Sequence, residues 1–155
     1  MYRHILVPLD GSELAECVLP HVEAIAKGRD VCKVTLVRVI PPLHLYGGIE
    51  SSLSPEERKR LEADSIRVAQ DYLTGVMERL KGVGIEAESA VLYSGQVVNE
   101  IVEYADKNDV DLIVIATHGR SGVSRLVLGS VADRLLRTAC TPVLMVRAPG
   151  CVPGI

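Results

Sequence analysis

The residues best suited to binding a small molecule form a glycine-rich stretch near the C-terminal end. Gly119 follows an apolar, strand-like segment, and Gly129 and Ser130 stand at the start of a predicted helix. Glycine lets a ligand approach the backbone, and the first N–H groups of a helix lack internal partners and carry partial positive charge. A phosphate suits such a place, where Arg120 would add charge. The alternative is structural: Gly129 ends a short helix over 121–128, and Ser130 caps the next one.

Two further side chains invite a chemical interpretation. Asp10 follows the first predicted strand, where its carboxylate could accept a hydrogen bond from a ribose hydroxyl or an adenine amine, or cap the helix that follows. His118 resembles a catalytic base, but no nucleophile and third partner can be placed with it from the sequence, so we favour a role in loop packing. Neither the Walker pattern nor G-x-G-x-x-G after the first strand is present.

The elements that must position these residues alternate between strand and helix. The predicted strands cover 3–9, 31–40, 85–92, 111–117 and 142–147, and the predicted helices cover 13–27, 54–81, 96–107 and 130–139. Four of the five strands are nearly continuous apolar runs, which indicates a parallel sheet covered on both faces, a three-layer α/β sandwich. Strand 85–92 alternates with glutamates, which favours a sheet edge. In such sheets ligands bind outside the carboxyl ends of the strands, where the strand order reverses.

Local signals add further expectations within one domain over 1–148. Pro20 is predicted to bend helix 13–27 from within. Segment 41–53 is predicted to be a mobile loop, and 149–155 a flexible tail. The inward-facing residues predicted for the long helix are Leu61, Val68, Tyr72, Val76 and Leu80.

Composition narrows the functional classes. The chain has 155 residues, of which 48% are hydrophobic and 24% charged, with a net charge of −3. That balance indicates a globular domain and argues against nucleic acid as a partner, and no apolar run approaches the ~18 residues of a membrane span. The four cysteines form no metal or redox motif, so we expect reduced thiols, no metal site and a cytoplasmic protein.

Several segments, taken in order, strongly resemble the universal stress protein (UspA) family. They are LVPLDGS at 6–12, LVRV at 36–39, IVIATHGR at 113–120, LGSVA at 128–132 and TPVLMV at 141–146. The likeness covers about residues 2–147. It implies the family's adenine nucleotide alpha hydrolase-like fold, with a five-stranded parallel sheet in the order 3-2-1-4-5.

The resemblance extends to a glycine motif. The ATP-binding branch of the family carries Gly, two residues, Gly, nine residues, Gly and then Ser or Thr. Here Gly119, Gly129 and Ser130 match the last three positions, whereas Ala116 replaces the first glycine. The Ala116 methyl group lies at the end of predicted strand 111–117 and is compatible with the implied fold.

The resemblance also implies roles for individual residues. Asp10 and Val39 would contact adenosine. The backbone that would hold the phosphates of ATP, alone or with Mg²⁺, belongs to Gly119, Gly129, Ser130 and Val131.

The implied function is an ATP-binding universal stress protein that acts as a nucleotide-dependent regulatory or protective module with unknown protein partners. Two alternatives stay open: a slow ATPase or autophosphorylating enzyme, and an interaction module that binds no nucleotide. We also expect a homodimer through strand 142–147, because this apolar strand would otherwise be an exposed edge.

Overall fold

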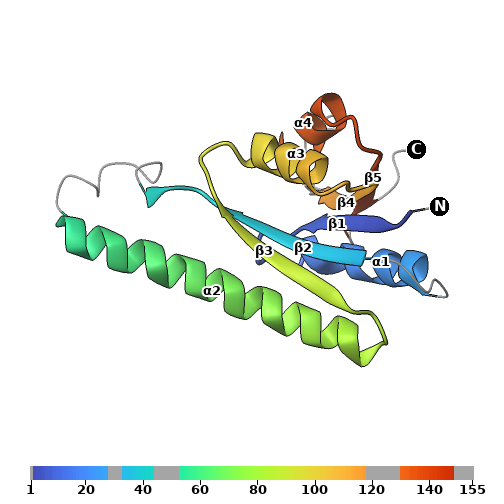
Figure 1. The fold of residues 1–155 in the computed structure, drawn as a ribbon, viewed down its shortest axis with the longest axis horizontal. Helices are drawn as coiled ribbons and strands as arrows, with labels where there is room; N and C mark the ends of the chain where they lie inside the picture. The colour runs from blue at the N-terminus through green and yellow to red at the C-terminus, as the bar shows by residue number, and fades with distance from the viewer. Residues whose placement is uncertain (1, 28–32, 44–52, 118–129, 149–155) are drawn as a thin grey trace.

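The computed structural model describes residues 2–27, 33–43, 53–117 and 130–148 of the chain. Its parallel strands form one five-stranded sheet in the order β3-β2-β1-β4-β5 (Figure 1). The strands are β1 (His4–Pro8), β2 (Lys33–Ile40), β3 (Ala87–Tyr93), β4 (Leu112–Thr117) and β5 (Val143–Arg147). The predicted fold class and strand order are therefore confirmed, including the place of β3 at an edge.

Helices cover both faces of this sheet (Figure 1). They are the 3₁₀ helix η1 (Ala15–Val18), α1 (Leu19–Ala26), α2 (Pro55–Gly82), α3 (Val97–Lys107) and α4 (Ser130–Thr138). Side chains of α1 and α2 pack in one core cluster and those of α3 and α4 in another, so the sheet separates two hydrophobic layers. This is the expected three-layer sandwich.

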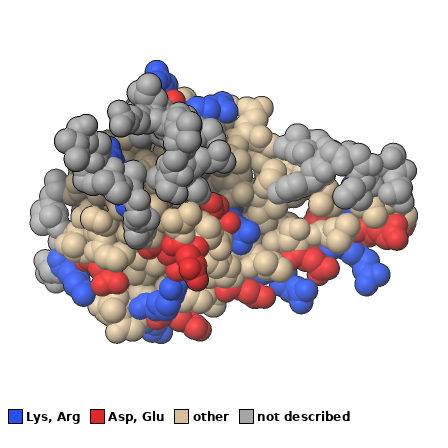
Figure 2. Space-filling view, turned by 180° about the vertical axis from the view of Figure 1, so that it is seen from behind, with Lys and Arg blue, Asp and Glu red and all other residues tan. Residues whose placement is uncertain are grey.

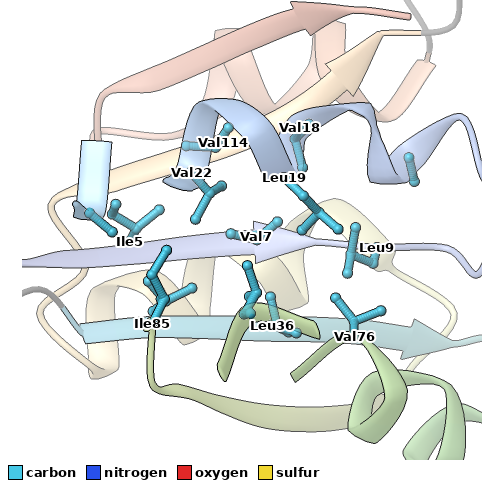
Figure 3. Packing of buried hydrophobic residues seen from close by; sticks show 14 of the residues in the cluster. Ile5, Val7, Leu9, Val18, Leu19, Val22, Leu36, Val76, Ile85 and Val114 are labelled. Carbon is cyan, nitrogen blue, oxygen red and sulfur yellow. The ribbon is translucent and has the colours of Figure 1, made fainter. Parts of the chain in front are cut away.

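The alternation of side chains along β1 supplies both layers. Ile5, Val7 and Leu9 point to the α1/α2 side, where Val22 and Val76 pack against them (Figure 3). Leu6 belongs instead to the α3/α4 cluster. A strand that is apolar on both faces is fully buried in the middle of the sheet, where β1 lies.

The segment predicted as one bent helix over 13–27 is in fact two helices. The 3₁₀ turn η1 ends at Val18, and α1 begins at Leu19, which puts Pro20 in its first turn. The N–H groups of a first turn have no partner within the helix, so proline costs nothing there. The prediction that Pro20 bends a helix from within is therefore wrong.

The start of α2 follows its sequence signal. The Ser54 hydroxyl oxygen accepts a hydrogen bond from the Glu57 N–H at 3.2 Å, and the Glu57 carboxylate accepts one from the Ser54 N–H at 2.8 Å. Pro55 is the first helical residue. This capping box satisfies two backbone donors, and the hydrogen bonds from Ser54 hold the pKa of Glu57 below its usual value.

Only the C-terminal half of α2 packs in the core. Its 28 residues span about 42 Å, while the seven residues of β3 span about 23 Å, and Figure 1 shows α2 extending past the strand. Its buried residues are Ala69, Leu73, Val76 and Leu80. Leu61 and Val68, predicted to face inward, are 43% and 57% exposed, so that prediction is wrong for the half that the sheet does not reach.

Charged side chains of both signs cover the outer surface. Figure 2 shows lysines and arginines interspersed with aspartates and glutamates along α2. Several of them form ion pairs along the helices, such as Arg67 with Asp64 at 3.1 Å. On this face the charges form a mixed surface rather than a basic patch.

At the amino end of the sheet, polar groups satisfy one another. The ring nitrogens of the buried His4 lie 2.9 Å from the Asn108 carbonyl oxygen and 2.9 Å from the Thr35 hydroxyl oxygen. The Asp111 carboxylate accepts hydrogen bonds from the N–H groups of Arg3 and His4, at 2.7 and 3.0 Å. Burial opposes ionisation of Asp111, but these donors outweigh it and lower the pKa of its carboxyl group.

Segment 41–53, predicted to be a mobile loop, falls mostly on residues outside those described, as does the predicted tail 149–155. Within the described ranges, no helix is both long enough and apolar enough to cross a membrane.

Candidate functional site

A pocket of about 180 Å³ lies at the carboxyl ends of β1, β2 and β4. The topology accounts for its position. The chain adds β2 and then β3 on one side of β1 and afterwards crosses to add β4 and β5 on the other side, so the strand order reverses at β1. We call this space the crevice pocket. Its lining includes Asp10, Val39, Ala116 and Val131.

These four residues come from separate parts of the chain. Asp10 follows β1, Val39 lies near the end of β2, Ala116 near the end of β4, and Val131 in the first turn of α4. All four were candidates from the sequence. Ser130, another candidate, is the first residue of α4. Gly119, Arg120 and Gly129 lie outside the described residues, and so does His118.

The walls of the crevice pocket are aliphatic. Val37 and Val39 of β2 face Val97 and Ile101 of α3, and Ile115 of β4 completes this apolar side. Smooth walls of branched side chains suit a flat, mostly apolar group, with specificity supplied by a few polar atoms. Asp10, which also lines the pocket, can supply such a polar atom through its carboxylate.

That carboxylate belongs to Asp10, which has local partners. Its Oδ1 accepts hydrogen bonds from the Ser12 N–H at 2.9 Å and from the Ser12 hydroxyl at 2.6 Å. The Ser12 hydroxyl oxygen in turn accepts one from the Ala15 N–H at 3.1 Å, at the start of η1. Ser12 therefore caps this turn, and Asp10 orients Ser12 while lining the crevice pocket. The hydrogen bond from the Ala15 N–H at the start of η1 goes to Ser12 rather than to Asp10.

The start of α4 supplies the opposite, electropositive end of the pocket. Val131 and Ala132 line the pocket and lie directly after Ser130, where the helix begins. The N–H groups of this first turn lack intrahelical acceptors, and the helix dipole adds partial positive charge. The pocket thus combines an acceptor at Asp10, aliphatic walls and a helix N-terminus.

Sequence reasoning missed a second group of residues beside Asp10. Gly11 has φ +88°, and a Cβ at this position would lie 3.0 Å from Nη1 of Arg38. The Arg38 guanidinium also lies over the Tyr72 ring, 5.5 Å from its centroid. The sequence signal for this group is Arg38 itself, a single arginine in the apolar strand segment LVRV. Its partner Tyr72 lies on α2 and is brought to it only by the tertiary fold.

Tyr72 stays a neutral phenol in this position. Burial raises its pKa, and the nearby carboxylates of Glu16 and Asp10 raise it further against the opposing effect of Arg79. The ring therefore offers Arg38 an uncharged aromatic face at all physiological pH values.

In the described part of the chain, no group of three or more His, Cys, Asp or Glu side chains could hold a metal ion. The acceptor, apolar walls and helix start of the crevice pocket instead suit an organic anion.

The model of the universal stress protein family matches residues 1–147. The chain belongs to this family. Universal stress protein MJ0531 of Methanocaldococcus jannaschii is 34% identical over 151 residues, covering 96% of this chain and 84% of its own length. Universal stress protein MJ0577 of the same organism is 28% identical over 158 residues, covering 95% of this chain and 96% of its own length.

Solved structures of universal stress proteins share the fold. The structure of MJ0577 superposes with a TM-score of 0.79 at 28% identity, over 97% of this chain and 99% of its own. The universal stress protein from Archaeoglobus fulgidus in complex with dAMP superposes with a TM-score of 0.63, also at 28% identity, over 93% of this chain and 97% of its own.

Proposed function

We propose that this universal stress protein binds an adenine nucleotide in the crevice pocket, with ATP as the expected ligand. In this proposal it acts as a nucleotide-dependent regulatory or protective module. One observation carries the proposal. Asp10, Val39, Ala116 and Val131 come from four separate segments, yet they line a single pocket at the point where the strand order reverses.

The pocket offers a suitable environment for each part of such a ligand. The adenine would lie between the aliphatic side chains of β2 and α3, which exclude water from its faces. Asp10 would accept a hydrogen bond from a ribose hydroxyl. The phosphates would lie at the start of α4, where N–H groups and the helix dipole favour negative charge.

Two further facts support this assignment. A relative that is 28% identical, the protein from Archaeoglobus fulgidus, has been solved in complex with dAMP. Ala116, the departure from the glycine motif, is half-buried and lines the pocket at the end of β4. Its methyl group adds to the apolar wall, and the strand keeps its pairing with β5 through Val146.

The direct test is to denature the purified protein and identify any nucleotide that it releases by chromatography and mass spectrometry. We expect ATP or ADP in an amount approaching one per chain. If protein stripped of ligand then shows no binding of ATP, ADP or AMP in calorimetric titrations, the proposal is wrong. Slow turnover of bound ATP in a phosphate-release assay would point instead to the enzymatic alternative.

We further propose that the protein forms a homodimer through β5. This strand is at an edge of the sheet, and its Leu144 is 36% exposed, while Leu136 on the adjoining α4 is 48% exposed. An apolar edge strand is normally covered, and a two-fold pairing would cover it.

Light scattering tests this proposal and should give twice the chain mass. Leu144→Lys should give monomers, whereas Val83→Lys, at an exposed position after α2, should leave the dimer intact. A parent protein that is monomeric at micromolar concentration would contradict this proposal.

The cytoplasm is the compartment that we propose. Cys17 and Cys140 are free thiols, as expected where cellular reductants keep cysteines reduced. Burial raises the pKa of Cys17, which lowers its reactivity as a thiolate.

A further inference from the structure

A second hollow, of about 490 Å³, adjoins the crevice pocket. We call it the outer hollow. Asp10 and Val39 line both spaces, so the two meet at the ends of β1 and β2. The protruding half of α2 forms the opposite wall through Asp64, Ser65 and Val68. This accounts for the exposed apolar side chains on that half of the helix.

The two spaces lie on opposite faces of β2. Val37 and Val39 point to the α3/α4 side, where they line the crevice pocket. Arg38 lies between them in sequence and therefore points to the other side, where it lines the outer hollow. A ligand that lies across the strand ends can thus reach Val39 and Arg38 together.

Among the described residues, an aromatic ring and a glycine lie beside Arg38. The Tyr72 ring lies beneath its guanidinium, 5.5 Å from centroid to Cζ, and a Cβ added at Gly11 would lie 3.0 Å from its Nη1. None of the ion pairs between described residues involves Arg38. Stacking on an aromatic ring orients a guanidinium and leaves its N–H groups directed outward in the ring plane.

The acidic groups around the outer hollow have partners of their own. Asp64 forms an ion pair with Arg67 at 3.1 Å, and Oδ1 of Asp10 accepts two hydrogen bonds from Ser12. Ser12 is a neutral donor, so Asp10 keeps its negative charge, and Arg38 is the cation in the lining of the outer hollow that forms no ion pair with another described residue. An anionic group that contacts the guanidinium would form charge-assisted hydrogen bonds with it.

We propose that Arg38 binds a second phosphate on the ribose of the bound nucleotide, so that the preferred ligands are adenine nucleotides phosphorylated at the 2′ or 3′ position. This inference rests on the proposed function, in which Asp10 contacts the ribose. With one ribose hydroxyl donating to Asp10, a phosphate on the other hydroxyl would project into the outer hollow, toward Arg38. The planar guanidinium matches the oxygens of a phosphate in a two-point contact, which lysine cannot make.

The experiment compares three ligands on the full chain by calorimetric titration: AMP, adenosine 3′,5′-bisphosphate and adenosine 2′,5′-bisphosphate. One of the bisphosphates should bind about tenfold more tightly than AMP, or better, the gain expected for a charge-assisted hydrogen bond. Comparing the two bisphosphates also shows whether the 2′ or the 3′ hydroxyl of the ribose faces the outer hollow. Arg38→Gln should abolish the difference between the ligands, and Arg38→Lys should keep only part of it.

Arg60→Gln is the matched control, because it removes one positive charge from an exposed position of α2 that does not line the outer hollow, and it should keep the full preference. A parent protein that binds AMP at least as tightly as both bisphosphates would overturn this inference and leave the proposed function standing. A parent that binds none of the three would overturn this inference, and the proposed function would fall with it only if ATP and ADP also failed to bind. The comparison on the parent needs no variant, so it decides even if Arg38→Gln fails to fold.

Discussion

The two ends of the sheet use similar polar residues in opposite ways. At the amino end, His4, Thr35, Asn108 and Asp111 satisfy one another and the backbone in a closed cluster. At the carboxyl end, Asp10 lines two open spaces, and the Arg38 guanidinium, which lies over the Tyr72 ring, lines one of them. Polar groups that satisfy each other stabilise a fold, whereas polar groups left facing a cavity are available to a ligand.

This contrast predicts that changes at the amino end alter stability alone, and changes at the carboxyl end alter binding. The largest effect should come from Asp111→Asn. The asparagine side chain has one acceptor oxygen for the N–H groups of Arg3 and His4, and its NH₂ group would face the N–H group that is left without an acceptor. We expect the free energy of unfolding to fall by about 2–3 kcal/mol, measured by urea denaturation, with ATP affinity unchanged. Asp71→Asn, on the exposed side of α2, is the control and should change stability by less than about 0.5 kcal/mol.

Thr35→Val should have the next largest effect. The methyl group fills the same volume but leaves a ring nitrogen of the buried His4 without its partner at 2.9 Å. Stability should fall by about 1–2 kcal/mol, again without a change in ATP affinity. A loss of affinity in a folded variant would mean that the two ends are coupled and that the contrast is wrong.

Gly11→Ala tests the carboxyl end and should lower both quantities. Its φ of +88° disfavours a Cβ, which would also meet the Arg38 guanidinium at 3.0 Å. We expect a loss of about 1 kcal/mol in stability and weaker binding of ATP, because the neighbouring Asp10 is displaced. Gly75→Ala is the control: nothing lies within 4 Å of its Cβ inside α2, so it should stabilise the protein by up to about 1 kcal/mol.

The smallest effect concerns pH. The folded-state pKa of Asp111 lies below its usual value, so its ionised form stabilises the fold above that value and the contribution is lost as the pH falls. The stability advantage of the parent over Asp111→Asn should therefore be constant above about pH 5 and narrow as the pH falls below it. Thermal unfolding at several pH values measures this, and a constant difference across the range would contradict the role given to the carboxylate.

Much of the fold could be read from the sequence because it depends on local patterns. The apolar runs of β1 and β4 identify central strands, and the glutamates near the start of β3 identify an edge. The likeness to universal stress proteins added the strand order. The capping box at Ser54 shows how a purely local signal sets the start of a helix.

The errors and omissions depend on distant contacts. Leu61 and Val68 continue the apolar pattern of α2, but only the size of the sheet decides which turns of the helix it covers. Pro20 lies at a helix start because η1 ends just before it. Arg38 gains its place from Tyr72, which lies far along the chain, so no local pattern could assign it.

The most direct test of the central claim is calorimetric titration of ligand-free protein with ATP, comparing the parent with Asp10→Ala and Ser12→Ala. Both variants break the contact between Asp10 and Ser12 at the start of η1, but only the first removes the carboxylate that lines the pocket. We predict that the parent and Ser12→Ala bind ATP with affinities within about threefold, and that Asp10→Ala binds about tenfold more weakly, or worse. Equal affinities in the parent and a folded Asp10→Ala, or no binding by the parent, would contradict the account.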